Sequence, residues 1–131
     1  GVQTCALPIW AIVPWGCRKL LQWIDQRYSR PEIVITENGC ALADHPRNGR
    51  VHDQARIDFL SAYLGEIHKA IAAGVNVTGY FLWSFMDNFE WASGFSKRFG
   101  LHYVDFASGE RTAKDSAAWY SQVVKQNGFE E

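Results

Sequence analysis

The sequence lacks the features that would tie it to a membrane or to a nucleic acid. It contains no run of about 20 apolar residues, the length that an α-helix needs to cross a bilayer. Its formal net charge is −1 and its Lys and Arg residues are scattered, so no basic stripe can neutralise a phosphate backbone. We therefore expect neither a membrane nor a nucleic acid among the partners.

Cysteine and histidine are also sparse. The three cysteines form no C-x-x-C pair, none has a histidine at metal-ligand spacing, and the four histidines form no H-x-x-x-H pair. These spacings indicate neither a disulfide framework nor a metal site. Thiols without an evident partner favour a cytoplasmic location.

Aromatic residues, in contrast, are abundant. They make up 15% of the chain and include six tryptophans, within a composition of 47% hydrophobic and 21% charged residues that is typical of a soluble globular protein. A tryptophan needs a core or a ligand that uses its flat face. We assign Trp10, Trp15, Trp23 and Trp119 to packing, because they fall away from the motifs described below.

Residues 1–9, GVQTCALPI, show neither helical nor strand periodicity. The string resembles a reading-frame translation of a sequencing-adapter oligonucleotide, so we expect these residues not to be native and leave them out of the fold prediction. The protein's own N-terminus would then be missing, and the sequence leaves secretion open.

From Trp10 onward, hydrophobic periodicity predicts an alternation of helices and strands. The expected elements are a helix over 14–29, a strand over 32–36, a loop over 38–52, a helix that Asp53 caps and Gly74 ends, a strand over 75–83, a long irregular loop, an extended piece over 101–106, and a helix over 113–127 with Thr112 and Asp115 in capping-box register. The second strand is apolar on both faces, as expected of a strand that is covered on both sides.

This alternation favours a parallel sheet of βα units. Two parallel strands alone leave both edges open, whereas a closed (β/α)8 barrel takes about 250 residues. We therefore predict an α/β fold in which residues 10–131 are the C-terminal part of a single TIM barrel domain, namely its last two strands and their helices.

One strand leads directly into a charged residue. In IVITENGCA, residues 33–41, four β-branched residues precede Glu37 and turn-forming residues follow it. Functional side chains of such barrels lie where strands end, and Trp83 ends the second strand before a loop that carries Glu90 and Trp91. Taken alone, TENG is a weak signal, because a Glu after a strand is more often a solvated turn residue or a helix cap.

Further motifs follow in a fixed order: RIDFL, AIAAGVNVTGYFLWS, DNFEWA, RFGL and RTAKDSAAWY. Together with TENG, this ordered set over residues 10–131 resembles the family 1 glycoside hydrolases, which include β-glucosidases, β-galactosidases and 6-phospho-β-glycosidases. The resemblance implies a retaining glycosidase mechanism that uses no metal and no organic cofactor.

The resemblance also implies roles for five residues. Glu37 would be the nucleophile that forms a covalent glycosyl-enzyme intermediate. Glu90 would accept hydrogen bonds from hydroxyls at the non-reducing end, and Trp91 would donate its indole N–H to a neighbouring hydroxyl. Trp83 would lie under the sugar ring, and Phe99 would pack beside its hydroxymethyl edge. Ordinary core packing remains the alternative for each aromatic residue.

The acid/base of this family is the Glu of an N-E-P motif, which the sequence does not contain. Glu66 is a poor substitute, because the apolar pattern places it on a solvent-leaning flank of its helix. We therefore expect a β-glucosidase-type protein, with terminal β-D-glucosides as substrates, whose 131 residues are inactive alone. Glu90 argues against phosphosugars, since it would repel a phosphate.

Two alternatives remain. A catalytically inactive homologue of the same fold would bind a sugar or serve as an interaction protein, and the presence of N-E-P in a missing upstream part would separate the two interpretations. An unrelated (β/α)8 enzyme such as an aldolase would need a strand-end Lys and would leave DNFEWA without a reason. The sequence does not specify the aglycone preference or the oligomeric state.

Overall fold

The computed structural model describes residues 4–5 and 10–129. In the first part of the chain, β1 (Thr4–Cys5) pairs antiparallel with β2 (Trp10–Ala11). The structure does not test the prediction that residues 1–9 are not native, and residues 1–3 and 6–9 of this stretch lie outside the described residues. It stays a prediction.

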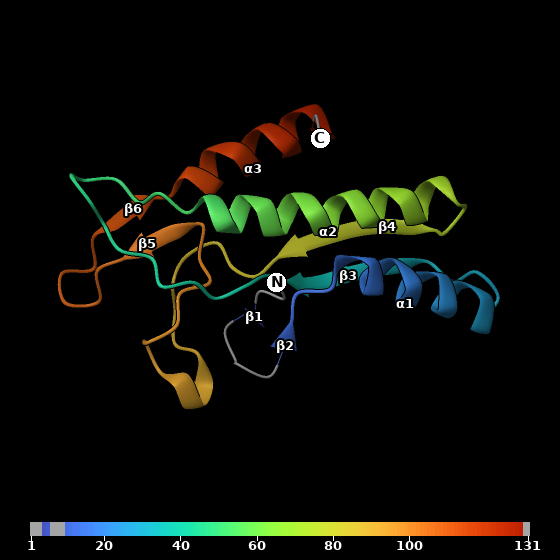
Figure 1. Ribbon diagram of the computed structural model, residues 1–131, viewed down its shortest axis with the longest axis horizontal. Coiled ribbons are helices and arrows are strands. Elements are labelled where there is room, and N and C mark those ends of the chain that lie inside the picture. The colour runs from blue at the N-terminus through green and yellow to red at the C-terminus, as the bar shows by residue number, and fades with distance from the viewer. Residues whose placement is uncertain (1–3, 6–9, 130–131) are drawn as a thin grey trace.

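The remaining helices and strands alternate largely as the sequence predicts (Figure 1). In chain order they are α1 (Pro14–Arg27), β3 (Ile33–Asn38), α2 (Gln54–Ala72), β4 (Val77–Leu82), the short 3-10 helix η1 (Trp91–Ser93), β5 (His102–Val104), β6 (Arg111–Ala113) and α3 (Asp115–Gln126). β3 and β4 are parallel neighbours in a two-stranded sheet. The described residues therefore hold two consecutive βα units and no closed barrel.

One face of the β3–β4 sheet is covered by α1 and α2. Leu21 of α1 joins Ile67 and Ala70 of α2 in a buried cluster. Ile33 and Ile35, which are alternate residues of β3, pack against this cluster. Burial of this apolar surface attaches the two helices to the sheet, because removing apolar area from water contributes about 25 cal/mol per Å².

The opposite face of the sheet is open. Val34 and Thr36 of β3 are exposed, as is Phe81 of β4, which exposes 62% of its surface. Alternate residues of a strand point to opposite faces, so these side chains lie on the side that no helix covers. Within the described part of the chain this face is exposed, and the expectation that the second strand is covered on both faces stays a prediction.

α1 ends earlier than predicted, at Arg27. Ser29 and Arg30 have left-handed backbone conformations, both with φ of 59°. Left-handed residues do not continue a right-handed helix, and a residue that precedes a proline is also disfavoured in the α-helical region. The helix therefore stops before the proline itself.

α1 and α2 are also joined by a charged contact. Arg18 Nε of α1 lies 2.6 Å from Glu66 Oε2 of α2, and Lys69 Nζ lies 2.9 Å from Glu66 Oε1. Only 13% of the Glu66 side chain is exposed, so its expected solvent-leaning position is wrong. Hydrogen bonds from Arg18 and from Lys69 hold the pKa of the Glu66 carboxyl below its usual value.

A strand stands where the last helix was expected to begin. β6 pairs antiparallel with β5, and Thr112 lies opposite Tyr103 in this pair. The strand fixes the backbone up to Ala113, so α3 begins only at Asp115, after the cap residue Lys114. The side chain of the cap residue Lys114 makes no capping hydrogen bond to α3. The predicted capping box is wrong because Thr112 belongs to β6.

The tryptophans outside the motifs differ in burial. Trp119 of α3 packs against a buried cluster that contains Phe59 and Leu60 of α2, which confirms its assignment to packing. Trp15 and Trp23 of α1 are exposed by 60% and 55%, so the same assignment is wrong for these two within the described residues. Nothing is described of the Trp10 side chain.

Candidate active site

The predicted nucleophile and the predicted floor of the sugar site lie at the ends of neighbouring strands. Glu37 and Asn38 are the last two residues of β3, and Trp83 directly follows Leu82, the last residue of β4. Trp83 N donates to the Asn38 carbonyl oxygen at 3.0 Å. Because the two strands are parallel, Glu37 and Trp83 are at the same edge of the sheet.

The glycine of TENG is required by the approach of the two strand ends. A Cβ atom added to Gly39 would lie 1.9 Å from the carbonyl oxygen of Trp83, far inside van der Waals contact. Only a residue without a side chain therefore permits this arrangement. The segment after Glu37 passes directly against the backbone that carries Trp83.

A hydrogen bond fixes the residue after Glu37. Tyr80 of β4 donates its hydroxyl to Asn38 Oδ1 at 2.9 Å. Burial raises the pKa of Tyr80, so the hydroxyl keeps its proton and remains a donor. Sequence reasoning did not assign Asn38 or Tyr80 to the site, because their contact depends on the register of β3 against β4.

Phe99 is brought to the same place by main-chain hydrogen bonds. Ser84 N donates to the Phe99 carbonyl oxygen at 3.3 Å, and Leu101 N donates to the Ser84 carbonyl oxygen at 2.9 Å. The segment around Phe99 thus runs beside the residue that follows Trp83. Glu37, Trp83 and Phe99 are therefore linked through adjacent backbone segments.

Glu90 and Trp91 lie on a separate turn of the long loop. Glu90 N donates to the Gly94 carbonyl oxygen at 2.7 Å, and η1 begins directly after Glu90. Trp91 exposes 82% of its surface. In Figure 1 this turn projects from the loop that follows β4. Within the described residues, no hydrogen bond joins Glu90 or Trp91 to Glu37.

Six charged residues next to these segments form what we call the ion cluster. Their ion pairs join the loop after β3, the start of α2, the loop after β4 and the start of α3. The members are Asp44, Asp53, Arg56, Asp87, Arg98 and Lys114. Carboxylates and cations are equal in number, as burial requires, because an unpaired buried charge is costly.

Arg56 connects the ion cluster to both site segments. It is 1% exposed and donates to the carbonyl oxygens of Cys40, Phe99 at 3.2 Å and Arg98 at 3.1 Å. Burial opposes the charge of Arg56, but the attraction of nearby carboxylates, above all Asp44, outweighs it and raises the pKa of the guanidinium. One permanently charged group therefore holds the segment after Glu37 against the segment of Phe99.

Asp87 anchors the long loop to the ion cluster. Its Oδ1 accepts from Gly100 N at 2.9 Å and lies 2.9 Å from Lys114 Nζ, while its Oδ2 lies 2.8 Å from Arg98 Nη1. Asp87 precedes Glu90 by three residues. Sequence reasoning missed the ion cluster, whose only local signal was that four of its six members, Arg56, Asp87, Arg98 and Lys114, lie within the quoted motifs.

Asp53 was expected to cap α2, and this is wrong for its side chain. The Asp53 carbonyl accepts from Arg56 N at 2.8 Å, but its carboxylate makes no capping bond to α2. The carboxylate instead accepts from Ser116 N at 2.9 Å and from Ser116 Oγ at 2.6 Å, at the start of α3. Asp53 therefore stabilises the first turn of a different helix.

The described part of the chain contains no group of three or more His, Cys, Asp or Glu side chains arranged to hold a metal ion. None of its helices combines the length and the apolar character needed to span a membrane.

The chain matches the family model described as Glycosyl hydrolase family 1 over residues 4–129. It is 54% identical over 123 residues to Beta-glucosidase A of Thermotoga maritima and 50% identical over 121 residues to Beta-glucosidase A of Acetivibrio thermocellus. These matches cover 93% and 92% of this chain but 28% and 27% of those proteins. The chain thus spans little more than a quarter of the length of these relatives.

Solved structures of family 1 β-glucosidases also superpose closely on the chain. The structure called Family 1 b-glucosidase from Thermotoga maritima superposes with a TM-score of 0.95 at 51% identity, over 99% of this chain and 29% of that one. The Thermotoga maritima β-glucosidase in complex with castanospermine superposes with a TM-score of 0.94 at 51% identity, over 99% and 30%. The resemblance to family 1 and the prediction that the fold is part of a TIM barrel are therefore confirmed. The chain belongs to glycosyl hydrolase family 1.

Proposed function

We propose that this chain supplies the nucleophile and part of the sugar site of a retaining β-glucosidase. Position carries the proposal: Glu37 is exposed at the end of β3, at the edge of the sheet where Trp83 follows β4 and Phe99 is bonded alongside. The relatives that are 54% and 50% identical are named β-glucosidases, which supports this substrate class.

The proposed reaction has two steps. In the first, a Glu37 carboxylate oxygen bonds to the anomeric carbon while the bond from that carbon to the aglycone oxygen breaks, and a separate carboxylic acid gives its proton to the leaving oxygen. In the second step, the separate acid, which is now a carboxylate, takes a proton from water, and the water oxygen displaces Glu37 from the sugar. The configuration of the anomeric carbon is retained.

The acid/base group comes from outside these 131 residues. The sequence contains no N-E-P motif. Glu66 cannot replace it, because Arg18 and Lys69 already bind its two oxygens on the helical side of the sheet. The carboxyl groups of a retaining glycosidase lie about 5–5.5 Å apart across the sugar, so the chain alone does not complete the reaction.

The proposed glycone site uses the two loop residues and the strand-end aromatics. Glu90 accepts hydrogen bonds from a pair of sugar hydroxyls, and the exposed indole of Trp91 donates to one of them. Trp83 lies under the ring, where C–H groups make its face apolar, and Phe99 packs beside the hydroxymethyl group. A terminal glucoside fits this set, whereas the charge of Glu90 disfavours a phosphosugar.

A hybrid enzyme tests the proposal. The matched 28% of Thermotoga maritima Beta-glucosidase A is replaced by the corresponding part of this chain, and hydrolysis of an aryl β-glucoside is measured. We expect turnover, and we expect Glu37→Gln to lower kcat by roughly 10⁴-fold or more, as removal of a covalent nucleophile does in other enzymes. Glu110→Gln, in an exposed turn, is the control.

Two outcomes contradict the proposal. Turnover by the 131-residue chain alone would show that it needs no external acid. A folded hybrid that binds a glucoside but does not hydrolyse it would favour the alternative of an inactive sugar-binding homologue.

A cytoplasmic location stays a prediction, and localisation of the tagged protein in its native host tests it.

A further inference from the structure

β3 has one residue more than β4 in the last part of their pairing. Ile35 lies opposite Tyr80, and Asn38 lies opposite Leu82. Two residues of β3 therefore stand between these pairs, where β4 has one. This is the geometry of a β-bulge, in which an extra residue interrupts the ladder and changes the direction of the side chains beside it.

The two residues in this bulge are Thr36 and Glu37. In a regular strand, alternate side chains share a face, so Glu37 would lie on the side of Ile33 and Ile35, which pack against the cluster between the sheet and the two helices. Instead, Thr36 and Glu37 are both exposed, and Asn38 is half-buried. The extra residue therefore turns Glu37 to the face that points away from α1 and α2.

Tyr80 connects the two ends of the bulge. Its backbone lies opposite Ile35, before the bulge, whereas its hydroxyl donates to Oδ1 of Asn38, after the bulge, at 2.9 Å. One residue of β4 thus fixes both sides of the irregular segment. A shift of one residue moves a side chain to the opposite face of a strand, so the position of Asn38 decides the face of Glu37.

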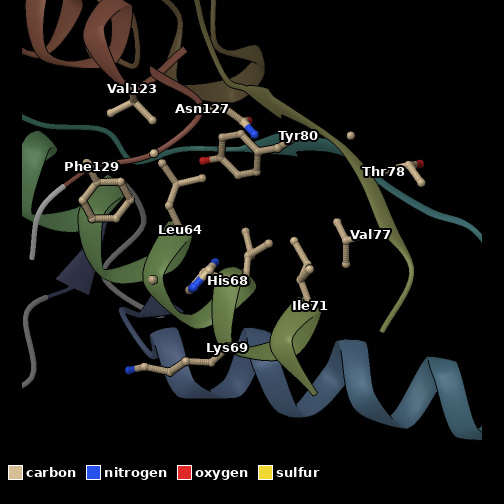
Figure 2. Close-up of a pocket in the computed structure, with 14 residues that line it drawn as sticks. Leu64, His68, Lys69, Ile71, Val77, Thr78, Tyr80, Val123, Asn127 and Phe129 are labelled. Carbon is tan, nitrogen blue, oxygen red and sulfur yellow. The ribbon is translucent and has the colours of Figure 1, made fainter. Parts of the chain in front are cut away.

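The Tyr80 ring is itself held in place. Tyr80 and Leu64 of α2 pack against the same buried cluster, and Figure 2 shows the ring between β4 and α2. Burial raises the pKa of Tyr80, so its hydroxyl keeps its proton and remains a donor at neutral pH. The donor is therefore fixed in both position and charge, which suits it to hold the Asn38 side chain.

We propose that Tyr80 and Asn38 are positioning residues for the nucleophile, because their hydrogen bond holds the bulge that directs Glu37 toward the sugar. The inference rests on the function proposed for Glu37 and adds the contact that orients it. Neither residue needs to touch the reacting atoms. Loss of the bond should therefore slow the attack of Glu37 on the anomeric carbon more than it weakens sugar binding.

The rate of labelling measures this attack directly. The hybrid enzyme is treated with a fluorinated β-glucoside that forms the glycosyl-enzyme intermediate but hydrolyses slowly, and the labelled fraction is followed with time. Tyr80→Phe removes only the hydroxyl. We expect its maximal labelling rate to fall on the order of tenfold or more, since a displacement of about 1 Å can cost roughly 100-fold. The glucoside concentration at half the maximal rate should change by less than about threefold.

Tyr63→Phe is the matched control. Tyr63 of α2 is also half-buried, and its hydroxyl accepts from Val13 N at 3.2 Å. The variant therefore removes a hydrogen-bonded hydroxyl of the same kind, at a place that does not belong to the bulge. We expect its labelling rate to equal that of the parent hybrid. Thermal unfolding of both variants shows whether they lose comparable stability.

A double-mutant cycle tests whether the two residues act through one bond. Asn38→Ala removes the acceptor, and we expect it to slow labelling as well. If the hydrogen bond carries the effect, Tyr80→Phe added to Asn38→Ala should slow labelling little further. Multiplied effects of the two changes would show that the residues act independently.

Hydrogen exchange gives a readout that does not depend on catalysis. It is measured at residues 36–39 in the 131-residue chain. We expect faster exchange there in Tyr80→Phe than in the parent chain, because the bulge loses its hydrogen bond. Tyr63→Phe should leave the exchange of these residues unchanged.

The proposal is wrong if Tyr80→Phe is labelled as fast as the parent hybrid, if Tyr63→Phe slows labelling equally, if the two changes multiply in the double variant, or if exchange at residues 36–39 stays the same. Failure of the proposed function gives a different pattern. If Glu37→Gln is still labelled, Glu37 is not the nucleophile. If Glu37→Gln is unlabelled and Tyr80→Phe is labelled normally, Glu37 keeps its role and only its positioning by Tyr80 and Asn38 is wrong.

Discussion

Lys114 is fully buried, and its ammonium group lies 2.9 Å from Oδ1 of Asp87. The same ammonium group also binds Asp44. Lys114 is the cap residue of α3, whereas Asp87 belongs to the loop that carries Glu90. The contact therefore attaches a candidate sugar-binding loop to the start of the last helix.

Replacement of this lysine should be strongly destabilising. We expect Lys114→Met to lower the free energy of unfolding by about 3–5 kcal/mol, because two buried carboxylates, Asp44 and Asp87, each lose one of their two cations. Urea denaturation measures the change. Lys125→Met, at an exposed position of the same helix, serves as the control. Asp44→Asn added to Lys114→Met should restore part of the loss, and failure of the double variant to recover any stability would contradict a charge-based explanation.

Asp53 should stabilise α3 more than α2. We expect Asp53→Ala to cost about 3–5 kcal/mol, because it leaves buried Arg56 without one of its carboxylates, and to speed hydrogen exchange in the first turn of α3. Asp115→Ala removes an exposed partner of His52 and should cost no more than about 1 kcal/mol. Faster exchange at the start of α2 and not of α3 would contradict the observed capping.

Gly39 should tolerate no side chain. We expect Gly39→Ala to cost about 1–3 kcal/mol or more, because its methyl group overlaps the Trp83 carbonyl and the strand ends must move apart. Gly128→Ala, where an added Cβ meets nothing, should change the unfolding free energy by less than about 0.5 kcal/mol. Thermal unfolding of both variants measures the difference, and equal stability would argue against the close approach.

The contact of Glu66 with Arg18 and Lys69 should make stability depend on pH. The folded pKa of Glu66 lies below its unfolded value, so the stabilisation is complete above the unfolded pKa of about 4.3 and is lost as the pH falls through the folded pKa. We therefore expect the parent chain to exceed Glu66→Gln in stability at pH 7 and the difference to shrink in acid. A difference that grows in acid would contradict this sign.

Local sequence signals predicted the helices and the two barrel strands. The β-branched run before Glu37 became β3, and the apolar periodicity between Asp53 and Gly74 became α2. Errors arose where a contact distant in sequence decided the outcome. Thr112 carries a capping signal but lies in a strand, because Tyr103 pairs with it.

The positions of the site residues were predictable from the sequence, but the contacts that hold these residues in place were not. The patterns placed Glu37 and Trp83 at strand ends, where the structure has them. The need for glycine at Gly39 follows from the approach of the Trp83 carbonyl, which a sequence does not display. The ion cluster was equally hidden. Asp53, one of its members, has the sequence pattern of a cap for α2, and only the folded chain shows that its carboxylate accepts from Ser116 instead.

The role of Glu37 is tested most directly by trapping the glycosyl-enzyme intermediate. The hybrid enzyme is treated with a fluorinated β-glucoside that forms the intermediate but hydrolyses slowly, and the labelled peptide is identified by mass spectrometry. We predict that the label lies on the peptide that contains Glu37 and is absent in Glu37→Gln. A label on any other residue, or equal labelling of the variant, would contradict the assignment.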